Sequence, residues 1–286
     1  RPKGAAFEMH DERSIPGGRS NTGIAFGPDG ALYVTDWMNG PSERGRIWKI
    51  DSTEGKDNPD RKRTRKLLSE GMAGKPESYL VASLAEPDFR VRKAAQFELV
   101  RRGETGRKAL LAVARQRGNQ LARLHAIWGI GQVARGWPDG QGKDPDAVRP
   151  LLELLTDKDT EVRAQAAKVL GESAHSQARE PLVALLKDPS IRVRFHAAIA
   201  LGKLKDPKAI APLLELVEGN DDVDAFLRHA AVMGLAASAK ANPKVLLQTT
   251  SSPHSSVRLA AILALRRHAY PGISSFLKDK DLYLVT

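Results

Sequence analysis

Cysteine is absent from the 286 residues of this chain. Its absence excludes disulfide bonds, thiolate metal sites, a cysteine nucleophile and haem attached through a CxxCH motif within these residues. It leaves the redox compartment open, because a chain without cysteine suits either one. Aromatic residues make up only 5% of the chain, and no apolar run approaches the roughly 18 residues of a membrane-spanning helix. We therefore expect no membrane span.

Several catalytic and metal-binding motifs are missing as well. None of the seven histidines forms an HExxH, an HxH or an i, i+4 pair, and neither GxSxG, GxGxxG nor a Walker sequence occurs. The sequence therefore predicts no catalytic residue and no metal ligand in this chain. His125, His196 and His229 recur near the same place in a repeat described below, and we expect them to pack or to form hydrogen bonds.

The chain carries 45 Lys and Arg against 34 Asp and Glu, a net charge of +11 that is spread along its length. The densest basic run is R-K-R-T-R-K at residues 61–66, in a polar stretch without apolar periodicity. Such a run can bind nucleic acid or an acidic surface. The composition favours a simpler interpretation, a solvated basic linker over residues 51–75 between two domains.

An internal repeat dominates the rest of the sequence. Six segments share a polar turn followed by V-R-x-x-A-A or a close relative of it. The intervals between their matching arginines are 31, 40, 31, 34 and 30 residues, and the arginines are Arg92, Arg123, Arg163, Arg194, Arg228 and Arg258. A period near 31 with one insertion indicates a repeat array.

Each repeat holds a second apolar-periodic stretch before this motif. Leucines at i, i+3 and i+4 give residues 148–155, 180–186 and 210–217 one apolar helical face, with an early proline in the first turn. Asp and Ser in the turns can cap the following helix, and Gly171 and Gly202 suit its C-terminal cap. Each unit is thus a helical hairpin, and stacked neighbours bury a shared core.

This pattern resembles the short variety of HEAT repeats. The resemblance covers residues 76–286 as six helix pairs, with residues 279–285 looking like a seventh second helix cut short. The longest interval includes a Gly- and Pro-rich excursion at 135–145. We expect it to be a surface loop whose Trp137 packs against the array, a contact point for a partner being the alternative.

Residues 1–50 have a different character. Short β-prone runs at 23–26, 31–36 and 45–50 are joined by turn-forming sequences, the first of them G-P-D-G. They predict a three-stranded antiparallel meander, such as one blade of a β-propeller. A lone blade has nowhere to bury its faces. Since the chain also begins at Arg1 and ends in an apolar stretch, we expect an internal piece of a longer protein.

The run G-I-A-F-G-P-D-G-A-L-Y-V-T-D-W at 23–37, followed by R-G-R-I-W-K-I-D at 44–51, resembles the last blade of a sorbosone/glucose-dehydrogenase-like β-propeller. In that family of membrane-bound dehydrogenases, HEAT-like repeats and a c-type cytochrome domain follow the propeller. The resemblance implies a periplasmic or exported protein that oxidises a sugar or alcohol with a quinone cofactor and passes electrons to haem c. The partners of this chain would be its own upstream propeller and the downstream cytochrome domain, and no cofactor would lie within the chain itself.

Two sets of residues are candidates for a functional site. Asp36 and Trp37 end a strand where propellers place ligand-contacting groups, so they could bind a sugar or a cation; the alternative is that they cap the turn and pack. The six repeat arginines could form a basic groove for a phosphate backbone. We favour their bridging to turn aspartates such as Asp157, Asp159 and Asp188 of adjacent repeats, since single-strand binding also needs interleaved aromatic residues that are lacking.

The sequence predicts a mainly α fold, a HEAT-like α-solenoid preceded by a short antiparallel β segment. It favours a non-catalytic scaffold or spacer between two redox domains, with a protein partner on the concave face. A free-standing scaffold that binds protein or nucleic acid is the alternative, and nucleic acid is the less favoured partner. A third hypothesis, a lyase-like helper protein for chromophore attachment, has no support beyond the short repeats. The fold alone does not distinguish these functions.

Overall fold

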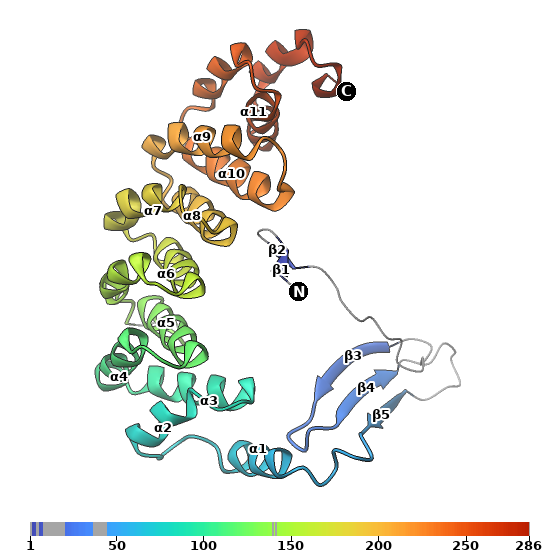
Figure 1. Cartoon of the computed structure of the whole chain (residues 1–286), viewed down its shortest axis with the longest axis vertical. Helices are drawn as coiled ribbons and strands as arrows, with labels where there is room; N and C mark the ends of the chain where they lie inside the picture. Colours follow the sequence, from blue (N-terminus) through green and yellow to red (C-terminus); the bar gives the residue numbers. More distant parts are fainter. Residues whose placement is uncertain are drawn as a thin grey trace.

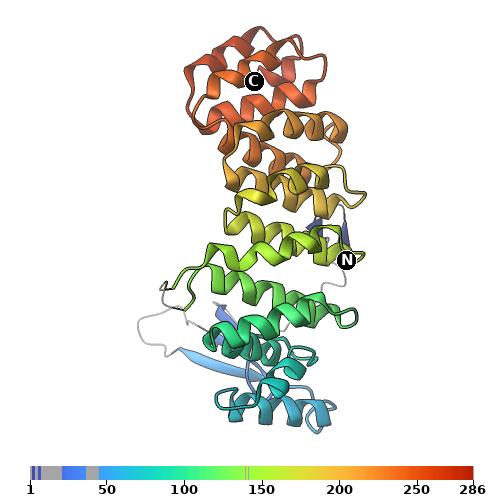
Figure 2. The same ribbon diagram turned by 90° about the vertical axis from the view of Figure 1, so that its left-hand side faces the viewer.

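The computed structural model describes residues 2–3, 6–7, 21–36, 45–138, 140 and 142–285. It confirms the predicted fold class: a HEAT-like solenoid follows a short three-stranded antiparallel sheet. Figure 1 shows the helices stacked in an arc, with the sheet beside the N-terminal end of the array on its open side. Figure 2, turned by 90°, shows the same array as a column of stacked hairpins. None of the described helices combines the length and the apolar character that a membrane span requires.

The sheet consists of β3 (Asn21–Phe26), β4 (Leu32–Asp36) and β5 (Arg46–Ile50), paired antiparallel in chain order. A separate two-stranded ladder joins β1 (Pro2–Lys3) to β2 (Ala6–Phe7). Register places Ile24, Val34 and Trp48 side by side, and Phe26 beside Leu32 and Ile50, so these six share one face. Ile24, Phe26, Trp48 and Ile50 remain exposed. The sheet therefore has an apolar face that nothing in the described chain covers.

The expected linker at residues 51–75 contains a helix, α1 (Pro59–Glu70). Asn58 caps it by accepting a hydrogen bond from the N–H of Asp60 at 2.7 Å, and Pro59 occupies the first helical position, where its missing N–H is not needed. Leu67 and Leu68 at its C-terminal end pack against the core of the array. The cap and the proline thus start a helix here. The many charged residues of this segment make its two apolar residues hard to recognise as a helical pattern in the sequence.

Two arginines tie the sheet to the helices. Arg61 of α1 donates from Nε and Nη2 to the carbonyl oxygen of Asp29, at 3.0 and 2.5 Å, and pairs with Asp51 at 2.8 Å. Arg90 of the array donates from Nη1 to the carbonyl oxygens of Phe26 and Gly27, at 3.0 and 2.6 Å. The β3–β4 hairpin is therefore attached to the start of the array by charge-assisted hydrogen bonds.

Within residues 76–285 the helices pair into six hairpins and a truncated seventh. The second helices lie on the inner side of the arc in Figure 1. The pairs, in order, are α2 (Glu77–Ser83) with α3 (Phe89–Arg101), α4 (Glu104–Arg115) with α5 (Gln120–Ala134), η1 (Pro145–Thr156) with α6 (Thr160–Glu172), α7 (Arg179–Leu185) with α8 (Ile191–Leu204), α9 (Ile210–Asn220) with α10 (Ala225–Ser238), η4 (Pro243–Ser251) with α11 (Ser255–Arg267), and η5 (Pro271–Lys278) with η6 (Leu282–Leu284). Short 3₁₀ segments η2 (Ser176–Ala178) and η3 (Pro207–Ala209) precede α7 and α9.

Turn side chains cap four of the described second helices, whereas Ser190, a serine expected to cap α8, forms no capping hydrogen bond through its side chain. The side chains of Asp88, Asn119, Asp159 and Asp224 each accept a hydrogen bond from a backbone N–H of the first turn of α3, α5, α6 and α10. The buried Val, Ala and Leu of the motif and the leucines of the first helices form one continuous core through all the hairpins. No hairpin in the described chain contains a core of its own, which is why the array folds as a stack.

Gly171 and Gly202 do not cap helices, contrary to expectation. Both lie inside the last turns of α6 and α8, where the neighbouring second helix approaches closely. A Cβ on Gly171 would stand 2.5 Å from the Cα of Ala200, and one on Gly202 would stand 2.8 Å from the Cα of Gly234. These glycines therefore set the spacing between second helices, and the left-handed residue that ends α8 is Lys205.

Trp137 packs against the array, the preferred of its two expected roles. Its ring lies 4.5 Å, centroid to centroid, from that of Phe97, and the Arg101 guanidinium lies 5.6 Å from its centroid. The side chain is half-buried, so the loop after α5 is fastened to α3.

Candidate functional site

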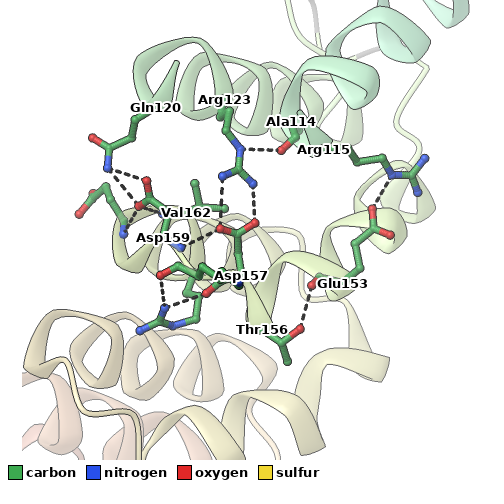
Figure 3. Close-up of polar contacts among 12 residues, drawn as sticks. Ala114, Arg115, Gln120, Arg123, Glu153, Thr156, Asp157, Asp159 and Val162 are labelled. Carbon is green, nitrogen blue, oxygen red and sulfur yellow. Dashed lines mark hydrogen bonds and ion pairs between the residues drawn. The ribbon is translucent and has the colours of Figure 1, made fainter. Parts of the chain in front are cut away.

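Arg123 of α5 connects two hairpins, as Figure 3 shows. Its Nη2 and Nη1 donate to the two carboxylate oxygens of Asp157, at 2.5 and 3.2 Å, and its Nε donates to the carbonyl oxygen of Ala114 at 3.0 Å. Asp157 belongs to the turn of the next hairpin, and Ala114 lies in the last turn of α4. One side chain thus satisfies the end of one helix and holds the following repeat in place.

The same arrangement recurs twice. Arg163 holds Asp188 through Nε and Nη2 at 2.8 and 3.0 Å, and Arg258 holds Asp279 at 2.7 and 3.0 Å. Arg163 and Arg258 also donate from Nη1 to the carbonyl oxygen six residues earlier, at 2.8 Å in both cases. Each of the three turn aspartates accepts a further hydrogen bond, at 2.8 Å, from the backbone N–H two residues later.

The other three ladder arginines do not bridge to the next turn, which corrects the expectation for all six. Arg92 donates only to the carbonyl oxygens of Glu86 and Pro87, at 2.6 and 2.7 Å, and its buried Nε has no partner among the described residues. Arg194 makes one long contact of 3.4 Å to the Asp188 carbonyl, and Arg228 pairs with Asp222 of its own turn. The residue that ends the next first helix differs in these repeats: it is Gln116 after α4, Asp221 in the left-handed conformation after α9, and Ser252 after η4.

The bridges at Asp157 and Asp279 change the acidity of those two carboxylates. Burial acts to raise the pKa of Asp157, but hydrogen bonds from Arg123 and from the Asp159 N–H outweigh it, so the pKa lies below its usual value. The Arg258 guanidinium lowers the pKa of Asp279 in the same way. Burial alone lowers the pKa of Arg92, which has no carboxylate partner of this kind in the described chain.

Figure 3 shows two further links between the same hairpins. Gln120 donates from Nε2 to both oxygens of Asp159, at 2.8 and 3.0 Å, and Arg115 pairs with Glu153 at 2.5 Å. Together with the ladder, these contacts direct guanidinium and amide groups toward the protein. The ladder arginines are therefore structural parts of the stack and not a free row of cations for phosphates.

A second set of polar contacts runs between the second helices. His125 Nδ1 lies 2.7 Å from Oε1 of Gln96, and Nε2 of Gln96 donates to Oε1 of Gln132 at 2.8 Å. Burial, with the positive charge of Arg92, lowers the pKa of His125 to about 4. A neutral, hydrogen-bonded imidazole is the packing role expected for this histidine. The described residues contain no group of three His, Asp or Glu side chains placed to hold a metal ion.

The contacts continue toward the C-terminus. Trp128 donates to Gln165 at 2.8 Å, Gln165 donates to Glu161 at 2.7 Å, and Arg192 pairs with Glu161 at 2.5 Å. His196, whose pKa burial lowers to about 4, has a buried Nε2 without a hydrogen-bond partner in the part of the chain that the structure describes. These side chains hold α5, α6 and α8 together.

Asp36 lies buried at the end of β4, where its Oδ2 accepts a hydrogen bond from Nε1 of Trp48 at 3.2 Å. Arg46, its partner in the strand register, stacks over Trp48 with 5.8 Å from the guanidinium to the ring centroid. The carboxylate is thus engaged within the sheet. Trp37, the other member of this predicted site, lies outside the described residues, so the sugar or cation site stays a prediction.

One feature of the inner face is not predicted by the repeat pattern. A groove of about 820 Å³ lies between α8, α10 and α11, with apolar side chains and arginines along it, among them Phe195, Phe226, Leu263, Arg266 and Arg267. These residues come from three hairpins and share no repeat position. The signals in the sequence are Phe226, which precedes the motif at a position held by polar residues in several other repeats, and the adjacent arginines that end α11.

Comparisons with known proteins agree with this architecture. Residues 148–236 match the family model described as HEAT repeats. No curated protein matches the chain. The matched residues cover the hairpins from η1 to α10, the regular centre of the array.

Several solved structures resemble the chain at low identity. They include an engineered protein (22% identity, 70% of this chain and 99% of that one, TM-score 0.46), the complex of CpcE and CpcF of phycocyanin lyase from Nostoc sp. PCC7120 (18%, 73% and 83%, TM-score 0.46) and YibA of Escherichia coli (20%, 82% and 90%, TM-score 0.47). Likeness at this level concerns the fold alone.

Proposed function

We propose that this chain is a non-catalytic helical scaffold that docks a partner protein on the inner face of its arc. The observation that carries the proposal is the groove between α8, α10 and α11, where apolar side chains and arginines line a surface hollow. Elsewhere along the array, the polar groups that lie close together hold one helix to the next. An apolar hollow bordered by charge is typical of a protein-binding surface.

The ladder geometry favours a protein partner over nucleic acid. A phosphate-binding groove needs cations that face solvent along a regular track. Arg123, Arg163 and Arg258, which have the repeat spacing for such a track, donate to aspartates and carbonyls instead. A nucleic-acid scaffold is the alternative function, and it predicts binding to DNA that weakens steeply as salt is raised.

Mapping the contact surface tests the docking proposal. A partner captured by the intact chain would be identified, purified and mixed with the chain, and hydrogen–deuterium exchange would be measured with and without it. We expect added protection on α8, α10 and α11. Protection confined to α4, α7 and α9 on the outer side would refute inner-face docking. Dehydrogenase activity of the purified chain alone would refute its non-catalytic character.

We further propose that the scaffold is part of an exported propeller–HEAT–cytochrome dehydrogenase. The support is the resemblance of residues 23–51 to a last propeller blade, together with the exposed apolar face of Ile24, Phe26, Trp48 and Ile50, which a neighbouring blade would cover. In that protein, the propeller with its quinone would oxidise a sugar or alcohol, and haem c would accept the electrons. The array would space and dock these two redox domains.

The coding sequence on either side of this chain tests that parentage. The proposal predicts further blades behind an export signal upstream and a CxxCH motif downstream. Stop codons close to both ends would contradict it and leave a free-standing scaffold. The docking proposal above does not depend on this outcome.

A further inference from the structure

The groove between α8, α10 and α11 has an apolar floor. Phe195 of α8, Val232 of α10 and Leu263 of α11 line it, one from each successive second helix. Val232 is buried, and the other two are half-buried, so they combine packing in the array with a surface open to a ligand. At about 820 Å³ the hollow has room for several bulky side chains.

An exposed apolar residue stands at one edge of this floor. Phe226, in the first turn of α10, lines the groove and is 57% exposed. A single exposed apolar residue is ordinary on a protein surface. Here it adjoins a hollow whose floor is also apolar, and a contiguous apolar surface of this kind marks an interaction site.

The charged side chains that line the groove are all arginines, so its charge is positive. Arg266 and Arg267 end α11, are exposed, and form no ion pair within the described chain, and no carboxylate is among the described residues that line the hollow. Arg228, also in the lining, already pairs with Asp222. Elsewhere, surface arginines such as Arg115 and Arg135 are matched by glutamates of the next hairpin. The groove is therefore a site of unmatched positive charge.

The helix dipole explains only in part why Arg266 and Arg267 stand together at the end of α11. Arginine in the last turn of a helix stabilises it through the helix dipole, and either residue alone would serve that purpose. The dipole does not require both to border an apolar hollow. An anionic ligand with apolar side chains fits both features of the surface at once.

We propose that this groove binds an acidic, amphipathic segment of a partner protein. Bulky apolar side chains of the segment, such as Leu or Phe, occupy the floor between Phe195 and Leu263 and cover Phe226. Its Asp or Glu side chains pair with Arg266 and Arg267 as bidentate contacts. The inference rests on the docking function proposed above and names the class of partner that docks.

Designed peptides test the chemistry without knowledge of the natural partner. The probe is a labelled peptide of about 16 residues with Leu and Phe at helical spacing and Glu elsewhere, titrated into the intact chain by fluorescence anisotropy. One comparison peptide carries Lys in place of Glu, another carries Ser in place of Leu and Phe, and a single-stranded oligonucleotide serves as a third probe. We expect binding of the acidic amphipathic peptide and at least tenfold weaker binding of every comparison probe.

Substitutions locate the site. Arg266→Glu with Arg267→Glu, and separately Phe226→Ser, should each weaken binding of the acidic peptide at least tenfold. The matched control is Lys240→Glu with Lys244→Glu, which makes the same charge change on exposed lysines of the neighbouring turn, outside the groove. It should change the affinity less than twofold, and circular dichroism melts would show that all variants are folded.

Three outcomes would overturn the proposal: equal binding of the Lys peptide, unchanged affinity in both groove variants, or binding of the oligonucleotide alone. The test also separates this proposal from the docking function. If no peptide binds but an identified partner still protects inner-face helices from exchange, the groove assignment fails and the docking function stands. If the partner protects only outer helices, both fail.

Discussion

Arg258 of α11 and Asp279 of the following turn form a buried ion pair, joined at 2.7 and 3.0 Å, with side chains only 2% and 3% exposed. Arg258 also donates to the carbonyl oxygens of Ser252 and Pro253, at 2.8 and 3.2 Å. The guanidinium therefore contacts both the turn before its own helix and the turn of the next hairpin. Among the described ladder arginines it is the most completely buried.

Breaking this pair should loosen the C-terminal end of the array. Arg258→Met leaves Asp279 buried without its partner, and such losses cost about 3–5 kcal/mol. We expect residues 271–285 to lose protection in hydrogen exchange and the free energy of unfolding in urea to fall. Arg107→Gln, which breaks the more exposed pair with Glu104, is the control and should cost much less, because water screens an exposed ion pair. Equal effects of the two substitutions would contradict the structural role of the ladder.

A missing bridge should be restorable. Gln116 ends α4 with φ −65° and ψ 143°, nearly the backbone of Asp157 (−63°, 149°) and Asp279 (−63°, 140°). Gln116→Asp should place a carboxylate within reach of Arg92 and stabilise the chain by about 1–3 kcal/mol, as hydrogen bonds to charged groups do. Urea unfolding measures the gain, and the same substitution in an Arg92→Met background should give none. A gain that persists in that background would show that the aspartate acts through another contact.

The close approach of second helices predicts a steric effect. Gly171→Val should cost about 1–3 kcal/mol of unfolding free energy, since its side chain would meet the backbone of Ala200. A Cβ added at Gly219 of α9 would instead meet no neighbouring atom within 4 Å. Gly219→Ala should therefore stabilise the chain by about 0.5–1 kcal/mol through helix propensity. Denaturant unfolding of both variants measures the contrast, and destabilisation by the alanine would contradict the packing described for α9.

The low pKa of His125 predicts a pH effect with a definite sign. The unfolded chain takes up a proton near pH 6.5, whereas the folded chain does so only near pH 4. Stability should therefore decline as pH falls from about 6.5 to 4, by at most about 3 kcal/mol for this group. His125→Gln should flatten the decline. Substitution of His229 by Gln serves as a control, because His229 is exposed and not packed as expected from the repeat. An unchanged slope in His125→Gln would contradict burial of a neutral imidazole.

The repeat and its turns could be predicted from the sequence, because they depend on residues close to one another in the chain. The V-R-x-x-A-A spacing places buried residues on one helical face, and a turn aspartate that follows a Leu-rich helix marks each arginine bridge, as at Asp157 and Asp188. The missing bridges have local causes too. At the helix end where Asp157 stands, the other repeats have Gln116, a left-handed Asp221 and Ser252. Arginines at a regular spacing therefore do not all find the same partner.

The groove and helix α1 depend on information that a repeat pattern lacks. Phe195, Phe226 and Leu263 meet only because three hairpins stack with a particular curvature, and each residue alone looks like an ordinary member of its helix. The charges of α1 obscure Leu67 and Leu68, which pack on the array. A glycine near a helix end, such as Gly171, serves either as a cap or as a close contact, and spacing does not distinguish these roles.

Titration of the purified natural partner into paired variants of the intact chain is the sharpest test of docking on the inner face. The inner-face variant is Arg266→Glu with Arg267→Glu. The outer-face variant is Lys108→Glu in α4 with Lys208→Glu in the η3 segment that precedes α9. Calorimetry should show affinity reduced at least tenfold by the inner-face pair and changed less than twofold by the outer-face pair. Undiminished affinity in the inner-face variant, with loss in the outer-face variant, would contradict docking on the inner face.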